Sequence, residues 1–142
     1  MSRRFGFLLT LLGVISVAAG CSSSSNAVFR MPATSMDRLK PALALLAAHG
    51  GLKARARIAT TEPCTFADFT DDPRMLVSLK ARRIGTGYEV RLVSTGLGAR
   101  YERYRKLEAE LGSTLRTIYG RALNVALNVA HDERTYPVCT AL

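Results

Sequence analysis

Three cysteines and two histidines are the residues of this 142-residue sequence whose types could do chemistry. Cys21, Cys64 and Cys139 are far apart, and no Cys-x-x-Cys pair is present, so their spacing matches neither a redox motif nor a metal site. His131-Asp132-Glu133 has acid and base residue types, but adjacent residues point in different directions and cannot converge on one ligand. His49 is expected at a helix C-terminus, where a cation interacts with the helix dipole. We therefore expect no catalytic residue, no metal and no cofactor.

The N-terminal segment has the pattern of an export signal. Arg3 and Arg4 precede an uncharged apolar run over residues 5–17, which is shorter than the roughly 20 residues that a spanning helix needs. Two kinds of processing compete. Cleavage after Ala19 would leave Cys21 as a free thiol, whereas cleavage directly before Cys21 would make it the mature N-terminus.

The stretch Ala18-Ala19-Gly20-Cys21 resembles the lipobox of bacterial lipoproteins, whose cysteine is acylated. The resemblance covers the first 21 residues, and it implies that residues 1–20 are a signal peptide and that Cys21 carries the lipid. It also implies a membrane-anchored protein of the cell envelope. Ser22 resembles the sorting pattern for the outer membrane, so we expect the domain there, facing the periplasm.

The cysteine count agrees with this interpretation. If Cys21 is a lipid attachment point, Cys64 and Cys139 remain as an even pair in an oxidising compartment, and we expect them to form a disulfide. Residues 21–34 contain a serine tract and show no clear period, which predicts a flexible tether between the lipid and the domain. Such a tether would reach about 45 Å at most.

The charge of the mature chain narrows the range of partners. Residues 21–142 carry 18 basic and 11 acidic side chains, so the net charge falls from +9 to +7 once the signal is removed. Export makes nucleic acid an unexpected partner, and the polyanions of an envelope are lipid headgroups and acidic proteins. The alternative is that the charge only keeps the domain soluble.

Hydrophobic periodicity predicts two helices. Residues 36–49 place Leu39, Leu43, Leu46 and Ala47 on one stripe, and the regular part is expected to begin near Lys40, with Pro41 in its first turn. Residues 99–119 form the second helix, with a buried stripe made of Tyr104, Leu107, Leu111, Leu115 and Ile118.

Alternating apolar and polar residues predict the strands. Residues 52–60 alternate strictly, and residues 75–83 and 88–95 form a hairpin around Gly85-Thr86-Gly87. Residues 61–74 are expected to be a loop, with Phe66 and Phe69 against the core. Residues 122–130 fit either a strand or a helix, and alternation favours the strand. The sequence thus predicts one α+β domain over residues 35–142, with the order α-β-β-β-α-β. Its antiparallel sheet has three to four strands, and both helices pack on one face.

A basic surface is the one feature that points towards binding. The polar sides of the predicted strands would bring five cations to the sheet face away from the helices: Lys53, Arg55, Arg57, Lys80 and Arg82. Like charges opposite one another destabilise a sheet, so either an anionic partner or an intervening acid such as Glu89 would relieve the repulsion. The alternative is an ordinary solvated face.

Two functions from different classes fit these observations. The first is a non-enzymatic lipoprotein that acts as a binding or assembly subunit for a protein or an anionic lipid of the envelope. The second is a small envelope hydrolase, or a hydrolase inhibitor, that uses the loop around Cys64 and the tail around His131.

Overall fold

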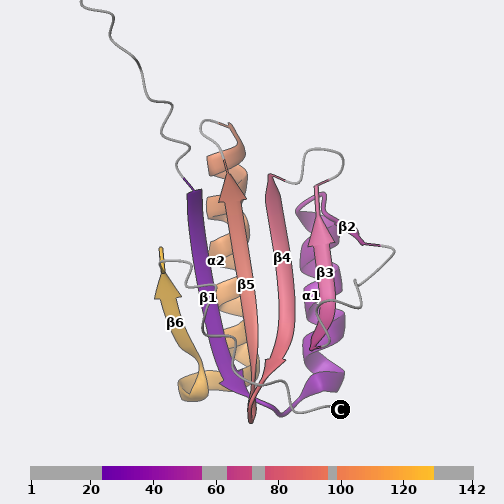
Figure 1. Cartoon of the computed structure of the whole chain (residues 1–142), viewed down its shortest axis with the longest axis vertical. Coiled ribbons are helices and arrows are strands. Elements are labelled where there is room, and N and C mark those ends of the chain that lie inside the picture. Colours follow the sequence, from indigo (N-terminus) through magenta and orange to yellow (C-terminus); the bar gives the residue numbers. More distant parts are fainter. Residues whose placement is uncertain (1–23, 56–63, 72–75, 96–98, 130–142) are drawn as a thin grey trace, which may run out of the picture.

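The computed structural model describes residues 24–55, 64–71, 76–95 and 99–129. They form one antiparallel sheet of six strands in the order β2-β3-β4-β5-β1-β6. Two helices lie behind the sheet in Figure 1, so they cover one face only. The predicted α+β class, with both helices on one face, is therefore confirmed. The predicted number of strands was too low.

One of the two missed strands is β1, Ser24–Pro32, which pairs with β5 along its whole length and with β6 on its other side. The expected tether over residues 21–34 is therefore wrong from Ser24 onward, and the domain begins there rather than at residue 35. The reason is that Ala27, Phe29 and Met31 alternate towards the helices and are buried.

Helix α1, Met36–His49, has the predicted bounds and buries Leu39, Leu43, Leu46 and Ala47, as expected. It begins before Lys40, however, so Pro41 lies inside the helix rather than in its first turn. The carbonyl of Ser35 accepts bonds from the amides of Arg38 and Leu39, which starts the helix at Met36. A proline this early removes one amide donor while the rest of the helix remains bonded.

The predicted strand over residues 52–60 is observed only as β2, Lys53–Ala54, and residues 56–60 lie outside the described residues. Within the predicted loop, Thr65–Thr70 forms β3. Phe66 and Phe69 are partly buried against the core, as expected. The prediction of a loop was wrong here because polar residues and the neighbouring prolines are typical of loops. The register of β3 also shifts between Thr65 and Ala67, so its residues do not alternate regularly.

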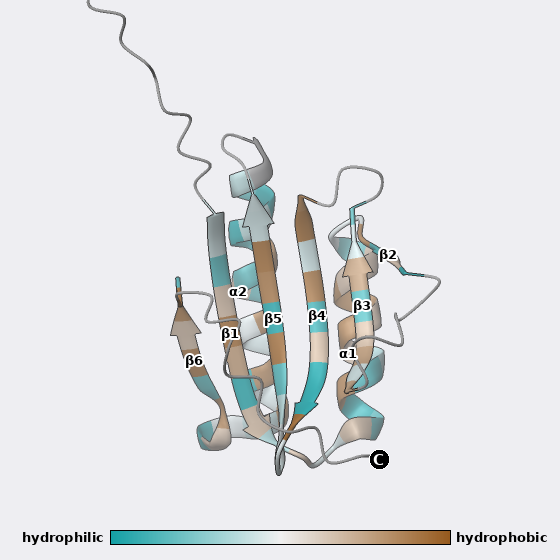
Figure 2. Ribbon diagram, viewed as in Figure 1, coloured by the Kyte–Doolittle hydropathy of each residue, from teal (hydrophilic) through white to brown (hydrophobic). Residues whose placement is uncertain are grey.

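The hairpin is confirmed as β4, Val77–Ile84, and β5, Gly87–Thr95. The turn is closed by Gly85 and Thr86, and Gly85 has a positive φ of 52°, a conformation that glycine adopts without a steric penalty. Brown and teal residues alternate along the central strands in Figure 2, which reflects one core-facing side and one polar side.

Helix α2, Ala99–Tyr119, also has its predicted bounds and buries Tyr104, Leu107, Leu111 and Leu115, with Ile118 partly buried. A short 3-10 turn, η1 (Gly120–Ala122), leads into β6, Asn124–Leu127, which decides the ambiguous segment in favour of a strand. The Tyr119 hydroxyl donates to the carbonyl of Thr34 at 2.8 Å and so ties the end of α2 to the turn between β1 and α1. In the described part of the chain, neither helix is long and apolar enough to span a membrane.

Candidate functional site: the open face of the sheet

The face of the sheet turned away from α1 and α2 is called the open face below. Strand register decides which side chains it carries, because alternate residues of each strand share a face. The partners Phe29, Val90 and Ala81 belong to the helix-covered core, so the residues between them point to the open face. The open face carries, from β1 to β4, Val28, Arg30, Glu89, Arg91, Lys80 and Arg82.

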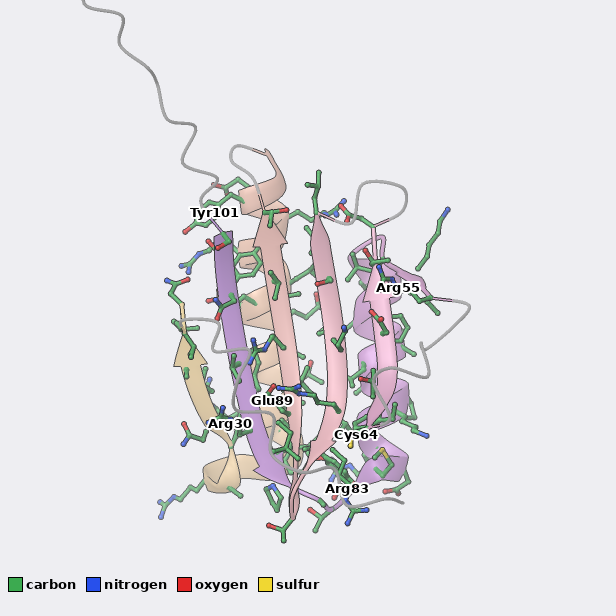
Figure 3. All side chains as sticks on the ribbon, in the orientation of Figure 1. Arg30, Arg55, Cys64, Arg83, Glu89 and Tyr101 are labelled. Carbon is green, nitrogen blue, oxygen red and sulfur yellow. The ribbon has the colours of Figure 1, made fainter. Side chains whose placement is uncertain are left out.

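Arg30, Glu89 and Arg82 stand directly opposite one another across β1, β5 and β4. We call these three residues the arginine row. Arg30 Nε lies 3.2 Å from Glu89 Oε2, and Arg82 approaches Glu89 Oε1 through Nη2 at 2.9 Å and Nε at 3.1 Å. Arg91, two residues further along β5, adds a third guanidinium at 3.4 Å. Figure 3 labels Arg30 and Glu89 in the lower half of the sheet, towards the end that lies far from Ser24.

Glu89 is 1% exposed, although it lies on the face that the helices do not cover. A carboxylate this deeply buried needs charged partners, since water no longer solvates it. Three guanidinium groups surround this one carboxylate, so the four side chains together carry a formal charge of +2. The side chain of Arg30 stays 64% exposed, while those of Arg82 and Arg91 are about one fifth exposed. The accessible part of this positive charge is therefore on the β1 side.

The neighbouring row of the open face continues the charge pattern towards β2. Arg91 stands opposite Lys80, and Lys80 stands opposite Asp68. Asp68 in turn forms an ion pair with Arg55, in which Arg55 Nη1 lies 3.5 Å from Asp68 Oδ2. Lys53 is exposed at the β2 edge and pairs with Thr70, on the same side as Asp68. In this row Asp68 lies between Lys80 and Arg55 and so separates two cations, whereas Lys80 and Arg91 stand directly opposite each other.

Four of the five predicted surface cations, Lys53, Arg55, Lys80 and Arg82, lie on the open face as expected, and Arg57 lies outside the described residues. The intervening role considered for Glu89 is confirmed. Prediction missed Arg30, because its segment was assigned to a tether. The signal that could have found it is the alternation Ala27, Phe29, Met31 around Val28 and Arg30.

Cys64 is disulfide-bonded. Both other cysteines lie outside the described residues, so the pairing of Cys64 with Cys139 and the lipidation of Cys21 stay predictions. The carbonyl of Cys64 accepts the amide of Arg83 at 2.9 Å, which places the half-cystine at one end of β3 (Figure 3).

The remaining side chains that could do chemistry, His49 and Tyr104, have structural surroundings. His49 Nδ1 lies 3.2 Å from Glu110 Oε1, and both side chains are about half exposed, so the pair links α1 to α2 at the surface. Burial raises the pKa of the Tyr104 hydroxyl, which therefore stays neutral. Among the described residues, no cluster of three or more potential metal ligands occurs. His131 lies outside them, so the hydrolase alternative is not tested.

A hollow at the β3 edge is lined by residues of α1, β2 and β3, including Lys40, Phe66 and Asp68. Its volume of about 220 Å³ is below the range of roughly 300–1,000 Å³ that is typical of small-molecule sites. The open face therefore remains the stronger candidate for binding.

No known protein family and no curated protein matches this chain. The functional argument therefore depends on the chemistry of the residues and on their arrangement.

The arginine row predicts that Glu89 is central to stability. Glu89→Gln leaves three guanidinium groups without their shared countercharge, and we expect the free energy of unfolding to fall by about 3 kcal/mol. The matched change Arg30→Gln removes an exposed partner and should cost less than about 1 kcal/mol. Urea denaturation of the two variants measures both values, and equal losses would contradict the central position of Glu89.

Proposed function

We propose that this chain is a lipid-anchored protein of the bacterial envelope that acts as a non-enzymatic binding or assembly subunit. In this proposal, Cys21 holds the domain at the membrane, and the open face docks an acidic surface of a partner protein. The observation that carries the proposal is the cluster of guanidinium groups around Glu89, on a sheet face that neither helix covers.

The anchor is supported by the resemblance to a lipobox and by the start of β1. Only Ser22 and Ser23 separate Cys21 from Ser24, the first residue of β1. A lipid on Cys21 would therefore hold the end of β1 within about 11 Å of the attachment point. This separation is much shorter than the tether that the sequence predicts, so the domain would stand directly against the bilayer.

The orientation that follows from a short anchor favours a protein partner over the lipid surface. The strands run lengthwise away from the Ser24 end (Figure 1). An anchor at that end presents the open face sideways, to a neighbouring protein, rather than flat against headgroups. Placement in the outer membrane, facing the periplasm, belongs to the same proposal and is supported by Ser22.

The anchor is tested by Cys21→Ala. We expect this variant to move from the membrane fraction to the soluble fraction of the envelope, because it has lost the site of acylation. The matched variant Cys139→Ala should stay in the membrane fraction. Mass spectrometry of the wild-type N-terminal peptide should show an acylated Cys21. A membrane-bound Cys21→Ala protein would contradict the anchor.

The binding surface is tested with poly-L-glutamate as a probe of acidic protein surface. Removing two charges from the open face, with Arg30→Gln and Lys53→Gln, should weaken binding several-fold, because rim cations steer and hold an anionic partner. The matched control removes two exposed cations from α2, with Lys106→Gln and Arg116→Gln.

The control should bind as the wild type does in the same titration. Equal weakening in both double variants would show that only net charge matters and would contradict a site on the open face. Tighter binding to vesicles containing phosphatidylglycerol than to poly-L-glutamate would assign the face to lipid instead.

A further inference from the structure

The two edge strands of the sheet differ in their protection against further pairing. The strand order places β2 at one edge and β6 at the other. Proteins keep an edge strand from pairing with other chains by making it short or by placing charged residues and prolines on it. β2 is short and includes Lys53, and Arg55 follows it directly. Residues 122–129, which contain β6, include neither a charged residue nor a proline. β6 is therefore the edge that a further strand can approach.

The backbone of β6 has bonding groups on both of its sides. The amide of Asn128 donates to the carbonyl of Asn26 in β1. Because the backbone groups of alternate residues point to the same side of an antiparallel strand, the even-numbered residues of β6 bond towards β1. The amides and carbonyls of Val125 and Leu127 therefore point outward. Among the described residues, β6 pairs with β1 alone, so these outward groups can bond an added strand.

The side chains of the same two residues are apolar and exposed. Val125 stands opposite Phe29 and Leu127 opposite Ala27, so both lie on the helix side of the sheet. They are nevertheless 38% and 55% exposed. Figure 1 shows the reason, because α2 lies behind β1 and β5, and β6 extends beyond it. An added strand with apolar residues at every second position would cover these side chains while its backbone bonds β6.

The charge beside β6 favours an acidic strand. Arg30 stands opposite Asn124 on the open face, and its side chain is 64% exposed although Nε bonds Glu89. An added strand would lie two strand spacings, about 10 Å, from β1. Arginine and glutamate side chains that extend towards each other can meet across this distance, since only Asn124 and the small Ala126 lie between them. Acids that alternate with the apolar residues of the added strand would therefore complement Arg30.

We propose that β6 takes up an extended segment of the acidic partner as an additional strand, with apolar residues beside Val125 and Leu127 and acidic residues facing Arg30. This inference rests on the proposed function for the identity of the partner. The rest of the same partner protein would cover the open face.

A second copy of this chain fits the edge less well than a different protein does. Two copies that pair through β6 are related by a two-fold axis, so their Ser24 ends point in opposite directions. β1 has nine residues and is about 30 Å long. The proposed anchor holds Ser24 within about 11 Å of the lipid, so both anchors could not enter one bilayer.

Strand addition is tested by amide hydrogen exchange of the full-length protein, followed by NMR. The probe is a short peptide in which valine and glutamate alternate. We expect it to slow exchange of the Val125 and Leu127 amides several-fold, because these amides bond the peptide. The Ala126 amide, which already bonds β1, should exchange as before.

Two results of this experiment would overturn the proposal. The first is binding of the peptide without slower exchange at Val125 and Leu127. The second is slow exchange of both amides before the peptide is added, which would show that a second copy or the chain itself already occupies the edge.

Two variants and a second peptide separate the contributions of apolar contact and charge. Leu127→Asn should weaken binding of the valine–glutamate peptide several-fold. The matched variant Leu45→Asn changes an α1 leucine that is 60% exposed, and it should bind as the wild type does. A peptide that alternates valine and lysine should bind more weakly, and Arg30→Gln should reduce this difference. Equal weakening by the two asparagine variants, or no preference for glutamate, would overturn the proposal.

Failure of strand addition and failure of the proposed function give different results. If poly-L-glutamate binding depends on Arg30 and Lys53 but the valine–glutamate peptide does not slow exchange in β6, strand addition fails and the proposed function stands. If the peptide slows exchange in β6 but poly-L-glutamate binding does not depend on the open face, the proposed docking surface fails and strand addition stands.

Discussion

The antiparallel pairing of β1 with β5 is the constraint on which the rest of the structure depends. It sets Phe29 opposite Val90 in the core and Arg30 opposite Glu89 on the open face. The same strand holds β6 at the sheet edge. Because β1 starts at Ser24, the pairing also fixes how close a lipid on Cys21 would hold the domain.

Glu89 shows how one acidic residue permits a strongly basic face. Arginines opposite one another across three strands would repel, but Glu89 lies between Arg30 and Arg82 and accepts from both. Burial strengthens this attraction and also makes it necessary, because a buried carboxylate without partners would be costly. The accessible positive charge is concentrated where Arg30 is exposed, and this is the basis for proposing an acidic partner.

The parts of the fold that follow from periodicity were predictable. Both helices have their predicted bounds, because their apolar stripes continue over three or more turns, and the hairpin is marked by its glycines. β1 was missed because its first residues belong to a serine tract, which is typical of a tether, and because the alternation of Ala27, Phe29 and Met31 is short and is interrupted by the apolar Val28. β3 was missed because prolines and acids surround it.

The sequence predicted that the candidate site carries basic side chains. It did not predict the ion pairs around Glu89 at the centre of that site. Lys80 and Arg82 alternate with buried residues in an obvious strand, so their face could be assigned from the sequence. Glu89 and Arg30 are 59 residues apart in the chain and meet only because β1 pairs with β5. Local sequence patterns do not show which strands pair.

Photo-cross-linking in living cells tests the central claim that the open face is the binding surface. A photoreactive residue replaces Lys53 on the open face in one strain and Lys106 on α2 in another, so each strain loses one exposed lysine. The account predicts a single protein of defined mass captured from position 53, its loss when Arg30 is also changed to Gln, and no such capture from position 106. Capture of that same protein from position 106 alone, or capture from position 53 that is indifferent to Arg30, would contradict the account.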